Sequence, residues 1–374
     1  MPKTDSICEV NAGSGWAAVS DRIAPIAELY ELATEAMPKC VAIFGCGRNG
    51  RSALSSLRSW GTKSCFFIDN DPSKQGKMVD GAEVVSPSNA RKMAPGIVFI
   101  AARAVLAIGR QLEQIGLPFI SFDAYCVIRH LERIKAVRDS SLYDTRSHVV
   151  FDAVLSSMLT GRASYCAEVM EGSQYFALPN FAGNCYEHFV DAGAFVGDTV
   201  EQFLWTTNGA FSRIYAFEPG KRPFEALCTR IRRLRTEWAL TEESIACIPA
   251  GLGESCQEMG WIAEAGGLLQ GASCTNRSSA DEVVQIYSLD AYLEGRPATF
   301  IKADVEGAEM ELLRGGADTI RRFSPKLAIS IYHSPEDMFR IAEYLKALIP
   351  GYNIAIRQHA PIRMETVLYA WVDE

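Results

Sequence analysis

The sequence predicts an α/β protein with two units, each built on a mainly parallel sheet, the second unit having seven strands. Three observations predict this class. Short apolar runs alternate with helical segments along most of the chain, which is typical of parallel strands joined by crossover helices. A glycine-rich loop follows such a run twice, at 45–50 and at 193–197. The runs at 352–357 and 365–372 lie too close together for a crossover helix, and therefore predict an antiparallel hairpin.

Composition narrows the classes of partner and the cellular compartment that we expect. The 374 residues suggest two domains, and the net charge of -8 disfavours nucleic acid or an anionic membrane as a partner, since phosphate-rich surfaces attract basic ones. None of the 11 cysteines stands in a Cys-x-x-Cys pair, which argues against a zinc site or a disulfide framework. We see neither a secretory signal nor a membrane span, and expect a cytoplasmic protein. A homo-oligomer stays open.

The first unit follows a polar and then helical lead-in over residues 1–36, and extends over 37–125. It is predicted to be Rossmann-like, with strands near 41–44, 65–68, 97–100 and 118–120. Its first loop matches the dinucleotide fingerprint, with an acid at the end of the next strand. Three interpretations remain open: NAD(P) binding, binding of a nucleotide or nucleotide-linked sugar, or a scaffold without a ligand. The fingerprint residues are Gly45, Gly47, Gly50 and Asp69.

The second unit, over 176–374, follows a helical connector at 126–175 that we expect to pack on it. Five strands alternating with helices or glycine-rich loops, followed by the hairpin, form the layout of a Rossmann-like methyltransferase rather than of a dehydrogenase. We expect an acceptor pocket in loops, including 260–279, but loops carry no transferable code for its ligand. The five strands are expected at 188–192, 213–217, 244–249, 298–303 and 326–331.

The second glycine loop predicts a cofactor site. Glycines allow the chain to turn tightly and let a ligand approach the main chain. Glu218 ends the next strand about 20 residues further on, the interval at which an acid meets a ribose diol. Acidic side chains near the loop suit a cationic sulfonium better than a pyrophosphate, which they would repel. The pattern therefore favours S-adenosylmethionine.

Three residues at later strand ends are candidates for the chemistry. Asp304 and Glu306 follow the strand at 298–303, and His333 follows the strand at 326–331, so all three are expected at the carboxyl edge of the sheet. His333 is one candidate for the base that removes a hydroxyl proton, because the reference pKa of histidine is closest to neutrality. Glu306 is the other candidate base. Asp304 could instead hold the methionine amino group, and Glu306 the acceptor hydroxyls. We expect no metal, although paired carboxylates would suit magnesium.

The second unit resembles the FkbM family of S-adenosylmethionine methyltransferases over about residues 165–374. The resemblance implies O-methylation of a hydroxyl on a sugar, glycan or natural-product acceptor. One departure is Gln358 before His359, where related tails tend to read Arg-His, which leaves a role for His359 in doubt. The segments that carry the resemblance are 174–176, 190–199, 216–219, 301–309, 330–337 and 365–370. The cofactor-binding residues that it implies, with their neighbours, are Asp191, Gly193, Ala194, Phe195, Gly197, Asp198, Thr199, Glu218, Pro219 and Asp304.

Two functions therefore stand beside each other. The leading one is an S-adenosylmethionine-dependent O-methyltransferase whose first domain assists acceptor binding. The alternative is a two-domain NAD(P)-linked oxidoreductase, or a non-enzymatic nucleotide-binding protein, in which both glycine loops bind nucleotides. The terminal hairpin and the Asp304–Glu306 pair favour the first.

Overall fold

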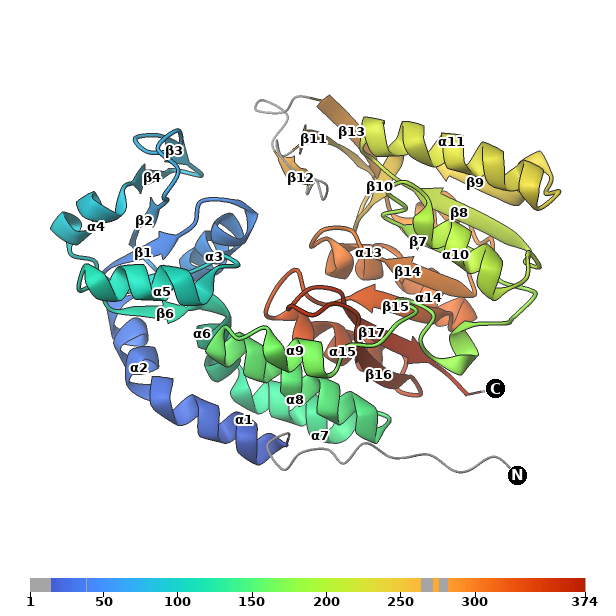
Figure 1. The fold of residues 1–374 in the computed structure, drawn as a ribbon. Helices are drawn as coiled ribbons and strands as arrows, with labels where there is room; N and C mark the ends of the chain where they lie inside the picture. The colour runs from blue at the N-terminus through green and yellow to red at the C-terminus, as the bar shows by residue number, and fades with distance from the viewer. Residues whose placement is uncertain (1–14, 38, 264–271, 276–281, 374) are drawn as a thin grey trace. The chain divides into compact units, whose positions relative to one another are not determined.

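The computed structural model describes residues 15–37, 39–263, 272–275 and 282–373, which divide into two compact units (Figure 1). Residues 148–169 group with the first unit, whereas from the sequence we expected the helical connector to pack on the second domain. The sequence shows that a helix has an apolar face, but it does not show which element packs on that face. Unit 1 consists of Met1–Lys135, His148–Val169 and Pro361–Arg363, and unit 2 of Ala136–Ser147, Met170–Ala360 and Met364–Glu374.

The sheet of unit 1 is parallel except at one edge. Strand β1 (Cys40–Phe44) lies in its middle and pairs in parallel with β2 (Ser64–Ile68) and β5 (Val98–Ile100). Such a strand is covered on both faces, which explains why residues 41–44 are at most 3% exposed. The order is β3-β4-β2-β1-β5-β6, completed by β3 (Met78–Val79), β4 (Ala82–Val85) and β6 (Phe119–Ser121).

Helices connect and flank these strands. Helix α3 (Arg48–Ser59) begins directly after the glycine loop that follows β1. In the part of the chain that the structure describes, no helix is long and apolar enough to cross a membrane. The other helices before residue 170 are α1 (Trp16–Ile23), η1 (Ala24–Ile26), α2 (Ala27–Ala36), α4 (Pro87–Met93), α5 (Val105–Gln114), α6 (Phe122–Arg129), α7 (Leu131–Ser141), α8 (Thr145–Thr160) and α9 (Ser164–Glu168).

Unit 2 is built on a seven-stranded sheet that ends in an antiparallel hairpin, which confirms the predicted fold class. Five strands are parallel, and their carboxyl ends therefore meet at one edge of the sheet. The order is β16-β17-β15-β14-β7-β8-β9, with β7 (His188–Ala192), β8 (Arg213–Phe217), β9 (Ile245–Ile248), β14 (Phe300–Ala303), β15 (Lys326–Ser330), β16 (Asn353–Gln358) and β17 (Thr366–Trp371).

A second, four-stranded sheet in unit 2 was not predicted. We had treated 260–279 as a loop, but two of its strands lie partly or wholly in this range, while 264–271 and 276–281 lie outside the described residues. Short strands that contain glycine look like loops in a sequence, because glycine weakens the strand pattern. The order is β10-β13-β11-β12, with β10 (Ala250–Leu252), β11 (Gln257–Ala263), β12 (Ala272–Thr275) and β13 (Glu282–Tyr287).

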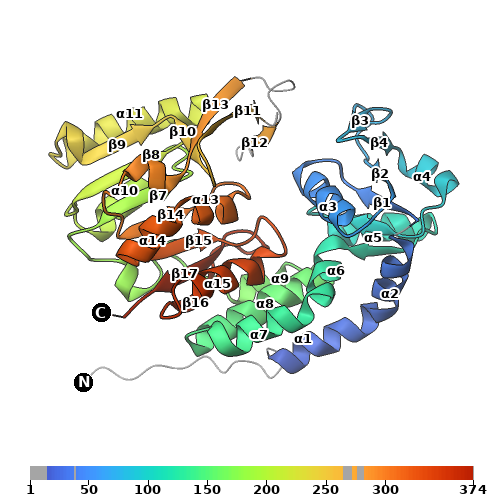
Figure 2. The ribbon, with the colours of Figure 1, turned by 180° about the vertical axis from the view of Figure 1, so that it is seen from behind.

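Aromatic side chains fill one face of the seven-stranded sheet. Phe189 of β7 stacks on Phe203 of α10 with ring centroids 4.4 Å apart, and Phe300 of β14 lies 4.9 Å from Phe189. Helices α10 and α11 cover this face (Figure 1), and α13 and α14 lie over the other, seen from behind in Figure 2. The helices of this half are η2 (Pro179–Phe181), α10 (Asp198–Thr206), α11 (Lys221–Glu237), η3 (Glu242–Ser244), α12 (Leu289–Leu293), α13 (Glu309–Gly315), α14 (Ala317–Phe323) and α15 (Asp337–Leu348).

Candidate active site

A buried ion pair anchors the glycine loop of unit 2. Asp191 of β7 and Lys302 of β14 are register partners, and Lys302 Nζ lies 2.9 Å from the Asp191 carboxylate. Burial opposes the charge of the lysine, but the attraction of Asp191 and Asp304 outweighs it and raises the pKa of Lys302. Lys302 also donates a hydrogen bond to the Gly193 carbonyl at 2.7 Å. Asp191, which we predicted to bind cofactor, thus contacts the protein's own lysine and supports the loop.

The backbone conformation at position 193 requires glycine. Its φ is 76°, and a Cβ there would lie 1.9 Å from the Asp304 carbonyl oxygen. Gly197, with φ 82°, directly precedes α10 and has a similar constraint, since its Cβ would lie 2.8 Å from Leu227 Cδ1. From the sequence we attributed these glycines to a tight turn and to room for a ligand. The structure supports the turn, and gives packing against the Asp304 main chain as the second reason for Gly193.

Glu218 ties the glycine loop to the end of β8. One of its carboxylate oxygens accepts from the Phe195 backbone N–H at 3.0 Å, and the other from the Gly220 N–H at 2.7 Å. The side chain is 6% exposed, and burial raises its pKa to about 7 in spite of these two donors. Each carboxylate oxygen can accept a second hydrogen bond. Glu218 can therefore brace the loop and still accept from a ribose.

The other predicted loop residues divide into buried and exposed ones. Ala194 and Thr199 are buried, at 1% and 7% exposure, so they form part of the support of the loop. Phe195 is 38% exposed with φ 45°, while Asp198 is exposed and Pro219 half-buried. Side chains that could touch a ligand directly are therefore those of Phe195, Asp198 and Pro219.

Asp304 accepts hydrogen bonds from two tyrosines. The Tyr175 hydroxyl donates to it at 2.8 Å, and the Tyr332 hydroxyl lies 3.2 and 3.3 Å from its two oxygens. Burial alone would raise the pKa of Asp304, but His333, Lys302 and the two hydroxyls lower it overall. The carboxylate is thus held ionised and in a fixed orientation beside the glycine loop.

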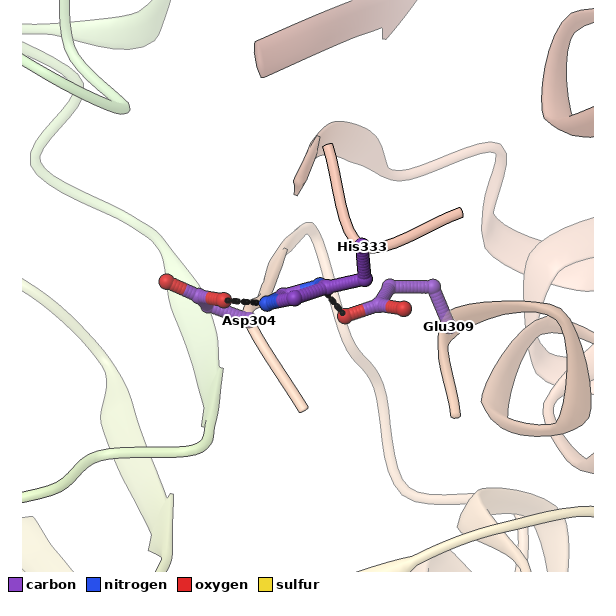
Figure 3. Close-up of side chains that lie close together, drawn as sticks. All are labelled: Asp304, Glu309 and His333. Carbon is purple, nitrogen blue, oxygen red and sulfur yellow. Dashed lines mark ion pairs between the residues drawn. The ribbon is translucent and has the colours of Figure 1, made fainter. Parts of the chain in front are cut away.

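His333 lies between the carboxylates of Asp304 and Glu309 (Figure 3), and the Glu306 carboxylate is a third neighbour. Its Nε2 lies 3.5 Å from Asp304 Oδ1 and 3.4 Å from Glu306 Oε2, and its Nδ1 lies 2.9 Å from Glu309 Oε1. The imidazole side chain is 5% exposed, and that of Glu306 is 43% exposed. The structure thus brings together Asp304, Glu306 and His333, the three candidates for the chemistry, with Glu306 on the open side.

The sequence reasoning missed Lys302, Glu309, Tyr175 and Tyr332 as members of this cluster. Lys302 carried a signal, because a charged residue inside an apolar strand requires a partner. Glu309 stands three residues after Glu306 and was singled out only as part of the family resemblance. The two tyrosines likewise stood only in segments of the family resemblance, and no local pattern shows that Tyr175 reaches Asp304 across 129 positions of sequence.

His359 has partners away from these residues. Its Nδ1 lies 3.0 Å from the Glu171 carbonyl, and its Nε2 lies 2.9 Å from the Tyr369 hydroxyl. Burial lowers its pKa, which keeps the ring neutral. These contacts give His359 a structural role in joining β16 to β17 and to the segment around Glu171.

The fingerprint residues of unit 1 make their contacts within the protein itself. Asp69 Oδ2 accepts from the Cys46 N–H at 3.3 Å and its thiol at 3.1 Å, and lies 3.4 Å from Lys74 Nζ. Gly45 has φ 99°, and a Cβ on Gly50 would lie 1.8 Å from the Gly45 carbonyl oxygen. Both glycines thus have reasons within the fold, and the acid expected to meet a ribose has partners in the protein.

The open position in this loop is Gly47. A Cβ built on it would meet nothing within 4 Å, and its φ of -75° is accessible to any residue. Nothing in the described fold of unit 1 requires glycine at 47. A ligand that approaches the loop would be a reason for glycine at this position. Gly47 is therefore the position at which nucleotide binding can be tested without disturbing the fold.

Comparison with known proteins found similar structures at low sequence identity. No curated protein matches the sequence. The crystal structure of a methyltransferase FkbM from Methylobacillus flagellatus KT matches over 95% of this chain and 98% of that chain, with 21% identity and a TM-score of 0.57, and thus shares the fold. An rRNA methylase from Streptococcus thermophilus matches over 56% of this chain and 94% of that chain, with 16% identity and a TM-score of 0.32.

The family comparison covers the same residues as the site. The model of the methyltransferase FkbM domain matches residues 191–354, a range that includes the glycine loop, Glu218, the Asp304 segment and His333. Residues 191–354 of unit 2 therefore match a methyltransferase domain of the FkbM family, as the sequence resemblance predicted.

Proposed function

We propose that the protein is an S-adenosylmethionine-dependent O-methyltransferase that acts on a hydroxyl of a sugar, glycan or natural-product acceptor. The observation that carries the proposal is the meeting of two groups of residues at one edge of the sheet. The glycine loop braced by Glu218 lies at the ends of β7 and β8, and Asp304 and His333 follow the adjoining strands β14 and β15. The first group suits a cofactor and the second a reacting hydroxyl.

The residues present fit S-adenosylmethionine. Glu218 would accept from the two ribose hydroxyls, and Phe195 and Pro219 offer apolar surface beside the ribose and adenine. The acidic surroundings, with Asp198 exposed and Asp304 held ionised, attract a positively charged sulfonium and methionine amino group. The cofactor supplies an activated methyl group, and the chain's own residues must align the acceptor and take its proton.

The reaction requires a base at the methyl group. In the transfer, the acceptor oxygen forms a bond to the methyl carbon while the carbon–sulfur bond breaks, and its electron pair stays on sulfur to give S-adenosylhomocysteine. The acceptor proton passes to His333 Nε2 or to the Glu306 carboxylate, which lie 3.4 Å from each other. Alignment of oxygen, carbon and sulfur contributes as much as proton removal.

Two measurements test this proposal. Calorimetric titration of the full-length protein should show binding of S-adenosylhomocysteine, and mass spectrometry should show one added methyl group on an acceptor from a screen of sugars, sugar nucleotides and glycans. Failure to bind S-adenosylhomocysteine would contradict the cofactor assignment. Binding together with methylation of a nitrogen or carbon acceptor would contradict the O-methyl part.

The ligand of unit 1 is a separate proposal. Of the three interpretations, we favour a scaffold that assists acceptor binding. Asp69 accepts from the Cys46 N–H and thiol, the Asp71 N–H and Lys74, whereas Glu218 accepts from two backbone N–H groups and keeps room for a ribose. The test is melting of the full-length protein with NADH or a nucleotide sugar, since a ligand at 100 times its dissociation constant adds about 2.7 kcal/mol of stability. A shift with either ligand, lost in Gly47→Val, would reject the scaffold interpretation.

A further inference from the structure

Glu309 is a buried acid to which the proposed function gives no role. It stands at the start of α13 and is 1% exposed. Burying a carboxylate costs free energy unless donors or a cation compensate for it. Its Oε1 has such partners, whereas its Oε2 accepts from no hydrogen-bond donor in the part of the chain that the structure describes. A buried carboxylate with one unpaired oxygen requires a reason beyond stability.

Glu309 closes the loop that carries Glu306. Its Oε1 accepts from the Val305 and Gly307 N–H groups at 3.0 and 3.3 Å. Between these two donors, Glu306 has a φ of 59°, a left-handed conformation that costs a residue other than glycine free energy. The two hydrogen bonds hold the loop in this conformation, and therefore fix the backbone at Glu306.

The same oxygen contacts the imidazole of His333. Glu309 Oε1 lies 2.9 Å from His333 Nδ1, and Figure 3 shows the ring between this carboxylate and that of Asp304. A carboxylate repels the lone pair of a bare ring nitrogen and attracts an N–H, so the proton of the neutral ring belongs on Nδ1. The lone pair is then on Nε2, which lies 3.5 Å from Asp304 Oδ1 and 3.4 Å from Glu306 Oε2.

The other acids near the ring are compensated or screened. The charge of Asp304 is offset by Lys302 and by the two tyrosine hydroxyls, and Glu306 is 43% exposed to solvent. Burial and the charge of Glu309 raise the pKa of Asp337 to about 7, so that this acid is partly protonated at neutral pH. The charged groups that act on His333 or on its partners are Lys302, Asp304, Glu306, Glu309, Asp337, Arg340 and Glu365.

We propose that Glu309 is the positioning residue that makes His333 Nε2 the base of the methyl transfer. This role rests on the proposed function and decides between the two candidate bases named there. The acceptor hydroxyl loses its proton to the Nε2 lone pair while its oxygen bonds to the methyl carbon, and the electron pair of the broken carbon–sulfur bond stays on sulfur. Glu309 stabilises the imidazolium that results, without taking the proton itself. Glu306, on the exposed side, aligns the acceptor.

The first test measures the ring itself and needs no acceptor. Long-range proton–nitrogen NMR on the full-length protein with nitrogen-labelled histidine distinguishes the two neutral tautomers, and His333→Ala identifies the signal among the five histidines. The neutral ring should carry its proton on Nδ1. Glu309→Gln keeps an oxygen for the loop N–H groups but removes the charge, and should lower the titration midpoint of His333 by about one pH unit or more. Glu311→Gln, an exposed glutamate on the same helix α13, is the matched control and should titrate as the parent does.

The second test is turnover. Glu309→Gln should lower kcat by roughly 10²–10⁴-fold, with KM for the acceptor and the affinity for S-adenosylhomocysteine near the parent values. The acid limb of the pH–kcat profile should move to lower pH, because an imidazole without a neighbouring carboxylate is a weaker base. A role confined to closing the loop would raise KM or lower stability and leave the acid limb in place. Glu311→Gln should react as the parent does.

The outcomes separate this inference from the proposed function. A proton on Nε2 in the neutral ring of the parent protein would overturn it, as would a ring that stays protonated throughout the pH range of turnover. Both results are obtained even if Glu309→Gln does not fold. An unchanged kcat and acid limb in folded Glu309→Gln would also overturn it, and methylation by the parent would then leave the methyltransferase proposal standing. Absence of S-adenosylhomocysteine binding by the parent would instead reject the proposed function.

Discussion

The two glycine loops of the chain share one backbone arrangement and differ in the side chains around it. In each, the first glycine has a positive φ and lies against the carbonyl of the residue that follows the neighbouring strand. A Cβ on Gly45 would lie 3.2 Å from the Ala101 carbonyl oxygen, and one on Gly193 would lie 1.9 Å from that of Asp304. An acid at the end of the next strand accepts from a loop N–H in both, Asp69 from Cys46 and Glu218 from Phe195.

The difference lies in what the neighbouring strand delivers. In unit 1 the strand β5 is followed by two alanines, whereas in unit 2 the strand β14 carries Lys302 and is followed by Asp304, whose Oδ1 lies 3.5 Å from His333 Nε2. The glycine pattern thus indicates close packing of main chains. It occurs both in a loop with reactive side chains beside it and in a loop without them. Reactive side chains on the adjacent strand are the feature that separates the candidate active site from the closed loop of unit 1.

The largest effect that we predict is on turnover. His333→Ala and Glu306→Gln should each reduce the rate of methyl transfer by roughly 10²–10⁴-fold, because the acceptor oxygen loses a group that helps to remove its proton. The affinity for S-adenosylhomocysteine should stay near the parent value, since both variants keep Glu218 and the glycine loop, the predicted cofactor contacts. Single-turnover kinetics with calorimetry measures both.

Glu311→Gln again provides the control, and should turn over at the parent rate. If both active-site variants bind cofactor normally and also react at the parent rate, the cluster around His333 has no part in the chemistry. The contrast between the two units would then rest on the cofactor loop alone.

The second prediction uses one substitution in both loops. Gly193→Ser should destabilise unit 2 by more than about 3 kcal/mol, because its Cβ collides with the Asp304 carbonyl at a positive φ. Gly47→Ser should change the stability of unit 1 by no more than about 0.5 kcal/mol, since that position is open and serine is a good N-cap.

Differential scanning calorimetry of the full-length variants, with the two units followed as separate contributions, measures this contrast. Equal destabilisation by both substitutions would show that the open position at Gly47 is filled in solution. It would also remove the structural distinction between the two loops.

A smaller effect is expected at the acid of the cofactor loop. Glu218→Ala should weaken S-adenosylhomocysteine binding by about 1.5–3 kcal/mol, the value of hydrogen bonds to a charged group. Asp69→Ala is the equivalent change in unit 1 and should leave this affinity unaltered. Calorimetric titration of folded Glu218→Ala with parent affinity would contradict the cofactor assignment.

The smallest effect is a pH dependence of cofactor affinity. Burial raises the pKa of Glu218 to about 7, whereas a ribose diol that donates two hydrogen bonds requires the ionised carboxylate. Below pH 7 the ligand must displace a proton, so affinity should fall by about tenfold per pH unit on acidification and level off above neutrality. Titrations between pH 5.5 and 8.5 would reveal this slope, and Glu218→Gln should remove it. A parent protein with flat affinity would show that the carboxylate does not contact the ribose.

Much of the fold and part of the candidate site were readable in advance. The five strands that alternate with helices in unit 2, the terminal hairpin and the methyltransferase resemblance follow from local patterns, because period, turn residues and chain length between strands are properties of the sequence itself. The same patterns brought Asp304, Glu306 and His333 to one sheet edge. The sheet of β10, β11, β12 and β13 was missed, since its short strands resemble loops.

The sequence by itself determined that two parallel sheets form, that each has a glycine loop after a strand, and that the acids follow strand ends. Only the tertiary structure decided the partners of those residues: Asp191 with Lys302, Tyr175 with Asp304 and Glu309 with His333. Side-chain partners come from packing between segments far apart in the chain, which no local period encodes. For that reason the sequence could place the candidate residues at one sheet edge, and could not give the ionisation and orientation of their groups.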